Sequence, residues 1–209
     1  MTDSSRTGEG PGDLYLVRHG ETEWSRTGRH TGWTDLPLTP RGEAQAGALA
    51  PLLAGRAYSL VLTSPLARAR RTAGLAGVTG AVVDADLHEW DYGAYEGVTT
   101  PEIRRERPGW DLWTDGVPAG PADRPGESPE QVGQRADRVL ARAVPALDDG
   151  DVLLVAHSHV LRVLTARRLG LPPSAGRLFR IETGTLNRLS TEHGRPVLTE
   201  WNTRAQTSR

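Results

Sequence analysis

Short apolar runs alternate along the chain with stretches that have helical spacing. The runs are rich in Leu, Val and Ala and are bounded by polar residues, which is typical of buried strands. The last two runs flank the turn Glu192-His193-Gly194-Arg195 and therefore predict a terminal hairpin. Strands are predicted at 13–18, 58–63, 80–84, 151–156, 185–191 and 196–201.

Helix signals lie in the intervals between these runs. Thr39-Pro40, Ser64-Pro65 and Ser128-Pro129 each place a hydroxyl residue at a helix N-cap and a proline at the first helical position. Gln131 completes a capping box with Ser128. Residues 20–38 lack clear periodicity and predict a loop. Helices are predicted at 40–53, from 65 onward, at 100–107, at 128–147 and at 160–169.

The alternation of strand and helix predicts an α/β fold, a three-layer α/β/α sandwich with a mostly parallel central sheet. Residues 13–202 are expected to form one domain. Residues 88–127, which are rich in proline and glycine, are expected to be an insertion over the face where the strands end. Residues 1–12 are expected to be a disordered tail, and 203–209 a second tail.

Two predicted strands end in a histidine, His19 after 13–18 and His157 after 151–156. Arg18 precedes the first histidine, and Arg68 lies one turn into the helix that follows the strand at 58–63. The carboxyl ends of parallel strands share one edge of a sheet, where ligands of open α/β sheets bind. Singly, a histidine at a strand end is more often a structural residue than a catalytic one, and an arginine on a helix usually belongs to a solvated face. Together, two arginines and two histidines at this edge favour a phosphate dianion as ligand.

The composition removes several classes of function. The 209 residues carry a net charge of -1, so there is no whole-chain attraction to nucleic acid or to a membrane surface. The apolar runs are too short to span a bilayer, and no apolar segment follows the polar N-terminus, so we expect a cytoplasmic protein without a secretory signal. The sequence contains no cysteine and no lysine. A cysteine nucleophile and Schiff-base chemistry are therefore excluded.

Phosphoryl transfer needs charge neutralisation, an in-line nucleophile and a proton for the leaving oxygen. Without cysteine, an imidazole nitrogen is the natural nucleophile for a covalent intermediate. Glu89, between Leu87 and Trp90, is the candidate general acid, although a surface carboxylate would have the same local sequence. The two histidines of His157-Ser158-His159 are weak evidence for a metal, so we expect neither a metal nor a cofactor.

The segment Leu16-Val17-Arg18-His19-Gly20-Glu21-Thr22 resembles the signature of the histidine phosphatase superfamily, also called phosphoglycerate mutase-like. The resemblance covers about residues 13–190. Further motifs occur in the same order as in that family: Gly32-Trp33-Thr34-Asp35, Thr63-Ser64-Pro65-Leu66-Ala67-Arg68, Glu89-Trp90-Asp91-Tyr92-Gly93-Ala94-Tyr95-Glu96-Gly97 and Val155-Ala156-His157.

The resemblance assigns roles to single residues. It implies that His19 becomes phosphorylated, that Arg18, Arg68 and His157 form the phosphate pocket, and that Glu89 donates a proton and later activates the hydrolytic water. Thr31 and Gly32 match the substrate-contacting loop of the family. Two positions depart from the family pattern: Ser25 stands where the family usually has an asparagine that contacts phosphate, and Ser158 where it usually has glycine.

The motif that begins at Glu89 is most similar to the branch of acid phosphatases and sugar-phosphate phosphatases. The resemblance implies a phosphatase of a small phosphorylated metabolite, either a sugar phosphate or a phosphoglycerate-like monoester, with no nucleic-acid or membrane partner. A homodimer is left open. The alternatives are a cofactor-dependent phosphoglycerate mutase, which the absence of lysine disfavours, and a non-catalytic phosphate-binding member of the fold.

Overall fold

The structure is a computed structural model that describes residues 12–205. Its sheet has six strands in the order β3-β2-β4-β1-β5-β6. The pairs β3–β2, β2–β4 and β4–β1 are parallel, whereas β1–β5 and β5–β6 are antiparallel. The strands are β1 (Leu14–Arg18), β2 (Tyr58–Thr63), β3 (Val82–Val83), β4 (Asp151–Ala156), β5 (Leu186–Glu192) and β6 (Arg195–Thr203).

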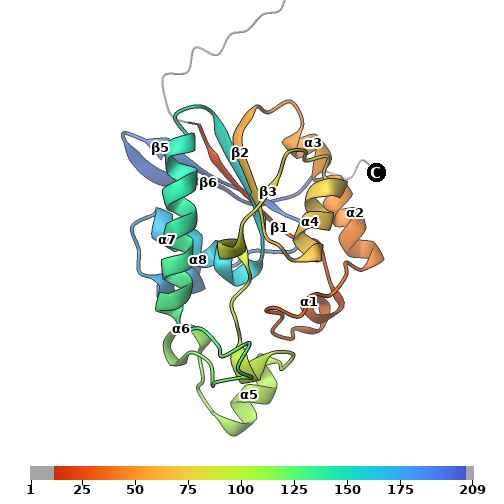
Figure 1. The fold of residues 1–209 in the computed structure, drawn as a ribbon, viewed down its shortest axis with the longest axis vertical. Helices are drawn as coiled ribbons and strands as arrows, with labels where there is room; N and C mark the ends of the chain where they lie inside the picture. Colours follow the sequence, from red (N-terminus) through yellow and green to blue (C-terminus); the bar gives the residue numbers. More distant parts are fainter. Residues whose placement is uncertain (1–11, 206–209) are drawn as a thin grey trace, which may run out of the picture.

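Helices cover both faces of this sheet (Figure 1). The helices α2 (Pro40–Ala48), α3 (Ala50–Leu53) and α4 (Ala67–Leu75) lie on one face, and α7 (Pro129–Ala146) and α8 (Ser158–Arg168) lie on the other. This arrangement confirms the predicted three-layer α/β fold. The shorter helices are α1 (Glu23–Thr27), α5 (Thr100–Glu106) and α6 (Leu112–Asp115), with 3₁₀ turns at η1 (Ala85–Leu87), η2 (Gly93–Tyr95) and η3 (Pro173–Leu178).

The two faces of the sheet carry separate hydrophobic cores. Along β1, Leu14 and Leu16 belong to the core under α7 and α8, while Tyr15 and Val17 belong to the core under α2 to α4. Successive side chains of a strand point to opposite faces, so a fully buried strand must be apolar at every position. β4 follows the same rule, and all of its residues are buried. The buried central strands therefore hold the strand ends in a fixed position.

Three local predictions need correction. The predicted N-cap at Ser64 is wrong: α4 begins at Ala67 with Leu66 at its N-cap, and Ser64 lies at the end of β2. The predicted loop at 20–38 contains α1, which begins with a capping box between Thr22 and Ser25. The predicted helix at 40–53 is interrupted at Leu49, between α2 and α3.

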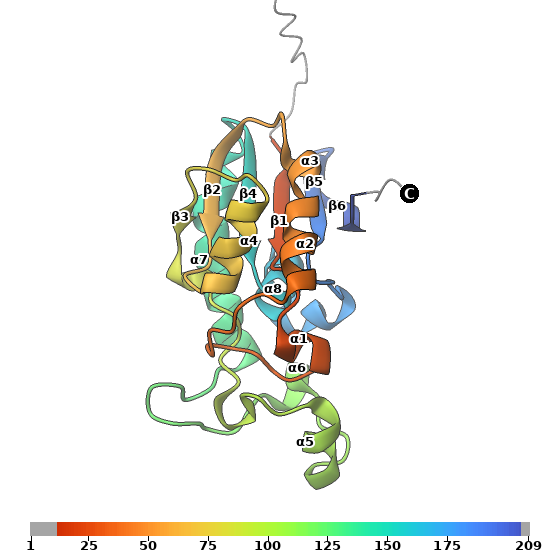
Figure 2. The ribbon, with the colours of Figure 1, turned by 90° about the vertical axis from the view of Figure 1, so that its right-hand side faces the viewer.

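The insertion at 88–127 lies beyond the carboxyl ends of the strands, at the bottom of Figures 1 and 2. It carries η2, α5 and α6, and α5 matches the helix predicted at 100–107 to within one residue. Most of the two predicted tails lies outside the described residues. Of the parts that are described, Gly12 donates a hydrogen bond to the Leu147 carbonyl over 2.7 Å, and β6 extends to Thr203. Among residues 12–205, no helix is both long and apolar enough to cross a membrane.

Candidate active site

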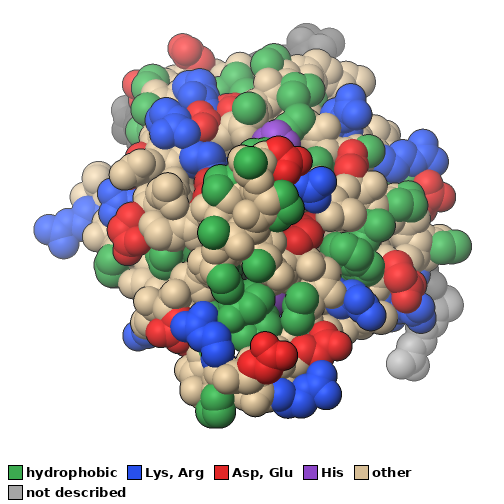
Figure 3. Space-filling view, turned by 60° about the horizontal axis from the view of Figure 1, so that its bottom comes forward, with side chains coloured by type: hydrophobic (Ala, Val, Ile, Leu, Met, Phe, Trp, Pro, Cys, Tyr) green, Lys and Arg blue, Asp and Glu red, His purple; other side chains and the backbone are tan. Residues whose placement is uncertain are grey.

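The parallel pairing of β1 with β4 brings the two strand-end histidines together. Arg18 pairs with Ala156 in the register of these strands, and the backbone N–H of His19 donates to the Ala156 carbonyl over 3.0 Å. The rings of His19 and His157 consequently lie with centroids 5.1 Å apart. Their exposed fractions are 4% and 0%. Histidine atoms form only small patches on the face of the molecule that Figure 3 shows.

The imidazole of His19 has a defined tautomer. Its Nδ1 lies 2.7 Å from the carbonyl of Gly20, and because a carbonyl can only accept, Nδ1 carries the proton. Nε2 is therefore left with its lone pair. Burial, together with the cations Arg68 and Arg18, holds the pKa of His19 well below its usual value. The ring is thus neutral at physiological pH and suited to act as a nucleophile through Nε2.

Both ring nitrogens of His157 form hydrogen bonds, which fix the orientation of the ring. Its Nδ1 accepts a hydrogen bond from Arg68 Nε over 3.2 Å, so Nε2 carries the proton and donates to Ser64 Oγ over 2.7 Å. The remaining Arg68 donors reach the carbonyls of Thr34, at 2.8 Å, and of Gly32, at 2.7 Å, as well as Thr31 at 3.3 Å. Four of the five N–H groups of Arg68 are therefore bonded to the protein. In this geometry Arg68 holds His157 and the loop at 31–34 in place.

Glu89 lies against the N-terminus of α8. Its Oε1 accepts from the backbone N–H groups of Trp90 and Val160, and its Oε2 accepts from that of His159, each over 2.9 Å. Burial raises the pKa of the Glu89 carboxyl, although these three N–H groups and Arg68 oppose the rise. A buried carboxyl with a raised pKa, held by fixed donors, is suited to general acid catalysis.

A cavity of about 500 Å³ opens at these strand ends. It brings together six of the residues predicted for the site: Arg18, His19, Ser25, Thr31, Glu89 and Ser158. Three predicted residues, Arg68, His157 and Gly32, are buried and do not belong to the lining of this cavity. The complete lining consists of Arg18, His19, Ser25, Gly28, Arg29, His30, Thr31, Glu89, Tyr92, Thr100, Ser158, His159, Arg162 and Arg180.

Two of the predicted site residues use their polar groups in hydrogen bonds within the protein. The Ser25 hydroxyl donates to the Thr22 carbonyl over 3.0 Å and accepts from the Thr22 N–H over 2.9 Å, so its one hydrogen is used within the α1 cap. Gly32 donates its N–H to the Glu96 carboxylate over 3.0 Å. A Cβ at Gly32 would lie only 2.5 Å from the Trp90 carbonyl oxygen, so this close contact requires glycine.

Several lining residues were not predicted as site residues, notably Arg162, Tyr92 and His30. Arg162 could have been found, because it lies four residues after Ser158 and so shares a helix face with the site. Tyr92 and His159 form a hydrogen bond of 2.5 Å between the phenol oxygen and Nδ1. Within residues 12–205, no three His, Asp or Glu side chains are grouped closely enough to hold a metal ion.

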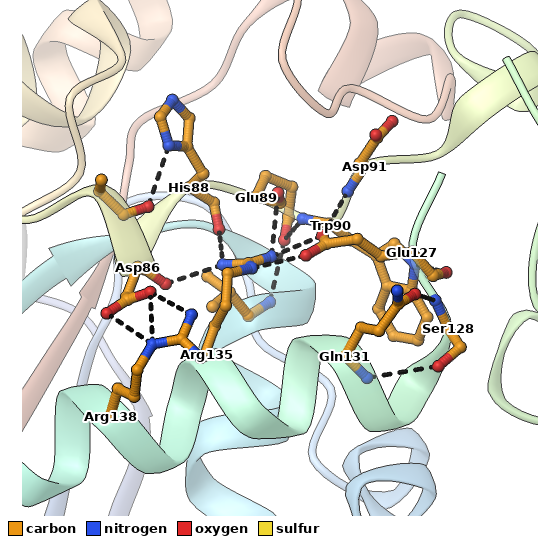
Figure 4. A network of polar contacts seen from close by, with 12 residues as sticks. Asp86, His88, Glu89, Trp90, Asp91, Glu127, Ser128, Gln131, Arg135 and Arg138 are labelled. Carbon is orange, nitrogen blue, oxygen red and sulfur yellow. Dashed lines mark hydrogen bonds and ion pairs between the residues drawn. The ribbon is translucent and has the colours of Figure 1, made fainter. Parts of the chain in front are cut away.

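Arg135, on α7, forms hydrogen bonds with the segment that carries Glu89 (Figure 4). The guanidinium forms two bonds with the Glu127 carboxylate, at 2.6 and 2.7 Å, and donates to the carbonyls of Asp86 and His88 at 2.7 and 3.0 Å. Glu127 in turn accepts from the Asp91 N–H over 2.9 Å. Arg135 therefore positions the segment that carries Glu89, the candidate general acid.

We expect Arg135→Gln to destabilise the protein by about 3 kcal/mol, because Glu127 would keep a largely buried charge without its partner. Displacement of the segment that carries Glu89 should lower kcat about tenfold, while KM should change less than about twofold. The matched control is Arg138→Gln, on the same helix, where the exposed arginine forms an ion pair with Asp86. Thermal unfolding and steady-state kinetics measure both effects. Equal losses in the two variants would contradict the positioning role.

Comparisons with known proteins show the family of the chain. A sequence profile of the histidine phosphatase superfamily (branch 1) matches residues 14–204. An acid phosphatase of Mycobacterium tuberculosis is 44% identical over 183 residues, which cover 87% of this chain and 87% of that protein. A sedoheptulose 1,7-bisphosphatase of Saccharomyces cerevisiae is 37% identical over 193 residues, which cover 75% of this chain and 67% of that protein.

Two further similarities bear on the fold and on the mutase alternative. The solved structure of an open reading frame of Mycobacterium tuberculosis superposes with a TM-score of 0.86 at 40% identity, covering 93% of this chain and 99% of that one. A probable phosphoglycerate mutase of Klebsiella pneumoniae is 32% identical over 192 residues, covering 90% of this chain and 89% of that protein. The mutase similarity is thus the weaker one.

The chain belongs to the histidine phosphatase superfamily, as its motifs predicted. It is a phosphoric monoester hydrolase, and the mutase alternative is not favoured, because the relatives with higher identity are named phosphatases.

Proposed function

We propose that the enzyme hydrolyses a sugar phosphate or a phosphoglycerate-like monoester through a phosphohistidine formed on Nε2 of His19. The observation that carries this proposal is the hydrogen bond of 2.7 Å between His19 Nδ1 and the Gly20 carbonyl. It leaves the Nε2 lone pair in a cavity that also contains Arg18 and Glu89. A nucleophile, a cation and a proton donor are the groups that phosphoryl transfer requires.

In the first step, Nε2 attacks phosphorus as the bond to the ester oxygen breaks. Glu89 gives its proton to the departing oxygen, and the alcohol leaves. Arg18 is placed to balance the charge of the phosphoryl oxygens. His157, which donates its ring proton to Ser64, lies next to His19. The N–H groups at the start of α8 supply further positive potential, and Ser158 is its first residue.

In the second step, the Glu89 carboxylate takes a proton from water, and the water oxygen attacks phosphorus. The N–P bond breaks, and its electron pair returns to Nε2 of His19. Inorganic phosphate leaves, and Glu89 is again protonated for the next cycle. Because both steps use one carboxyl group, its pKa must lie near the working pH. Burial of Glu89 raises its pKa in this direction.

The relatives support the substrate class. One is named a sedoheptulose 1,7-bisphosphatase and another an acid phosphatase. The polar and cationic lining of the cavity is suited to a small, hydrated and anionic metabolite. Residues 13–202 are proposed to act as one catalytic domain, with the insertion at 88–127 determining which substrate fits.

Phosphate release from a panel of sugar phosphates, phosphoglycerates and nucleotides tests the proposal. We expect the highest kcat/KM with a sugar phosphate or a phosphoglycerate. Incubation with 3-phosphoglycerate should yield inorganic phosphate, whereas a mutase would yield the isomeric ester. Isomerisation without release, or a preference for nucleotides, would contradict the proposed substrate class.

A further inference from the structure

The cavity contains more positive charge than one phosphate group requires. Its lining includes Arg18, Arg29, Arg162 and Arg180, but only one carboxylate, Glu89. Among the described residues, only Arg180 of these four has a carboxylate within ion-pair distance, namely Glu182 at 2.9 Å. A phosphate monoester carries at most two negative charges. Arg18, Arg29 and Arg162 are thus the three lining cations without such a partner in the described part of the chain, and Glu89 is proposed to be protonated when the ester binds. Three positive charges against the two negative charges of a phosphate monoester indicate that the preferred ligand carries a second anionic group.

Arg162 is the cation best prepared to bind such a group. Its Nε donates to the Gly176 carbonyl over 2.9 Å, and one terminal nitrogen donates to the Arg177 carbonyl over 3.0 Å. The guanidinium carbon lies 4.6 Å from the centroid of the Trp113 ring. A guanidinium has five N–H groups, so three remain for a ligand. Because its orientation is fixed in advance, little conformational entropy would be lost on binding.

The surroundings of Arg162 differ from those of Arg68. Arg68 is fully buried, and four of its N–H groups are bonded to the protein, whereas Arg162 lines the cavity. Burial lowers the pKa of Arg162 to about 10, with Glu89 opposing the shift and with Arg18 and Arg180 adding to it. The group stays protonated at neutral pH. An anion bound between these cations would reduce their mutual repulsion.

We propose that Arg162, with Arg180 at the exposed rim, forms a second anion subsite that selects phosphate esters carrying a further carboxylate or phosphate group. The inference rests on the proposed function, because it places the reacting phosphate at His19 and Arg18. The planar fork of Arg162 is suited to both groups, which it can bind through two parallel hydrogen bonds.

Two matched substrate pairs test this subsite. 3-Phosphoglycerate and glycerol 3-phosphate differ by a carboxylate in place of CH₂OH, and fructose 1,6-bisphosphate and fructose 6-phosphate differ by the second phosphate. We expect the wild type to prefer the more anionic member of at least one pair by about tenfold or more in kcat/KM. The pair that shows the preference identifies the group. Equal kcat/KM within both pairs would overturn the proposal.

Arg162→Gln should reduce that preference ratio by about tenfold or more, and Arg180→Gln by about threefold. The control is Arg167→Gln, on the same helix, where the arginine pairs with Asp137 and should leave the ratio unchanged. Arg180 is exposed, so its variant remains informative if Arg162→Gln fails to fold. An unchanged ratio in both variants, or the same loss for both members of a pair, would overturn the subsite.

Binding to His19→Ala separates this inference from the proposed mechanism. Calorimetry with 3-phosphoglycerate and glycerol 3-phosphate should give the same preference, and adding Arg162→Gln should remove it. If the wild type hydrolysed none of the esters, the proposed function would fail, while the two dissociation constants would still decide whether Arg162 recognises the second anion.

Discussion

His19→Ala is expected to lower kcat for every phosphate ester by at least about 10⁴-fold. Without this imidazole, the proposed covalent intermediate cannot form at residue 19, and water would have to attack the ester directly. Phosphate release under saturating substrate measures the loss. Thermal unfolding should show that the fold persists, because the contacts that hold β1 between β4 and β5 come from backbone pairing.

The control for this variant is His193→Asn. His193 lies at the turn between β5 and β6 with φ of 50°, a conformation that asparagine tolerates. It should retain full activity. If His19→Ala kept more than about a tenth of the wild-type rate, His19 would not be the nucleophile.

Glu89→Gln is expected to lower kcat/KM for an alkyl phosphate by about 10²- to 10⁴-fold, the usual contribution of general acid catalysis. The loss should be far smaller for p-nitrophenyl phosphate, whose leaving group needs no proton. In the wild type the His159 N–H donates to Glu89 Oε2, whereas in the variant the amide NH₂ group would face this N–H and the hydrogen bond would be lost. The free energy of unfolding should therefore fall by about 1–3 kcal/mol. Glu43→Gln, at an exposed residue that pairs with Arg71, is the control.

The pH dependence of kcat/KM for the alkyl ester provides a second measure of Glu89. The first step requires a protonated Glu89, so the rate should fall as pH rises through the raised pKa of this carboxyl. His19 must be neutral, and its lowered pKa moves the acidic limit to low pH. Activity should therefore be highest on the acidic side of neutrality. An equal loss for both esters, or an unchanged alkaline limb in Glu89→Gln, would contradict the role of general acid.

The central strands could be predicted closely because each contains a short, mostly apolar run bounded by polar residues. The ranges predicted for β2 and β4 agree with the structure. Ser64 was misread because a serine before a proline satisfies the capping rule locally, whereas the chain continues extended and its hydroxyl meets the His157 ring. The short helix α1 was missed because its five residues are too few to show a period.

The two histidines of the candidate site could be placed from sequence because they lie at strand ends, where topology determines their position. His19 and His157 follow parallel neighbours, so their proximity follows from the alternation of strands and helices. The proposed second subsite divides in this respect. Arg162 follows Ser158 by one helical turn and could have been found from sequence, whereas the position of Arg180 depends on longer-range packing. Arg180 precedes Ile181, whose carbonyl binds Arg18 over 2.6 Å, in a segment without regular structure that no local pattern could place.

The stereochemical course at phosphorus tests the covalent mechanism most directly. The measurement uses a phosphorothioate ester made chiral by oxygen isotopes, hydrolysed by the wild-type enzyme. Two in-line displacements, first by Nε2 of His19 and then by water, predict overall retention of configuration. Inversion would mean that water attacks the ester in a single displacement, and it would contradict the phosphohistidine on which this account depends.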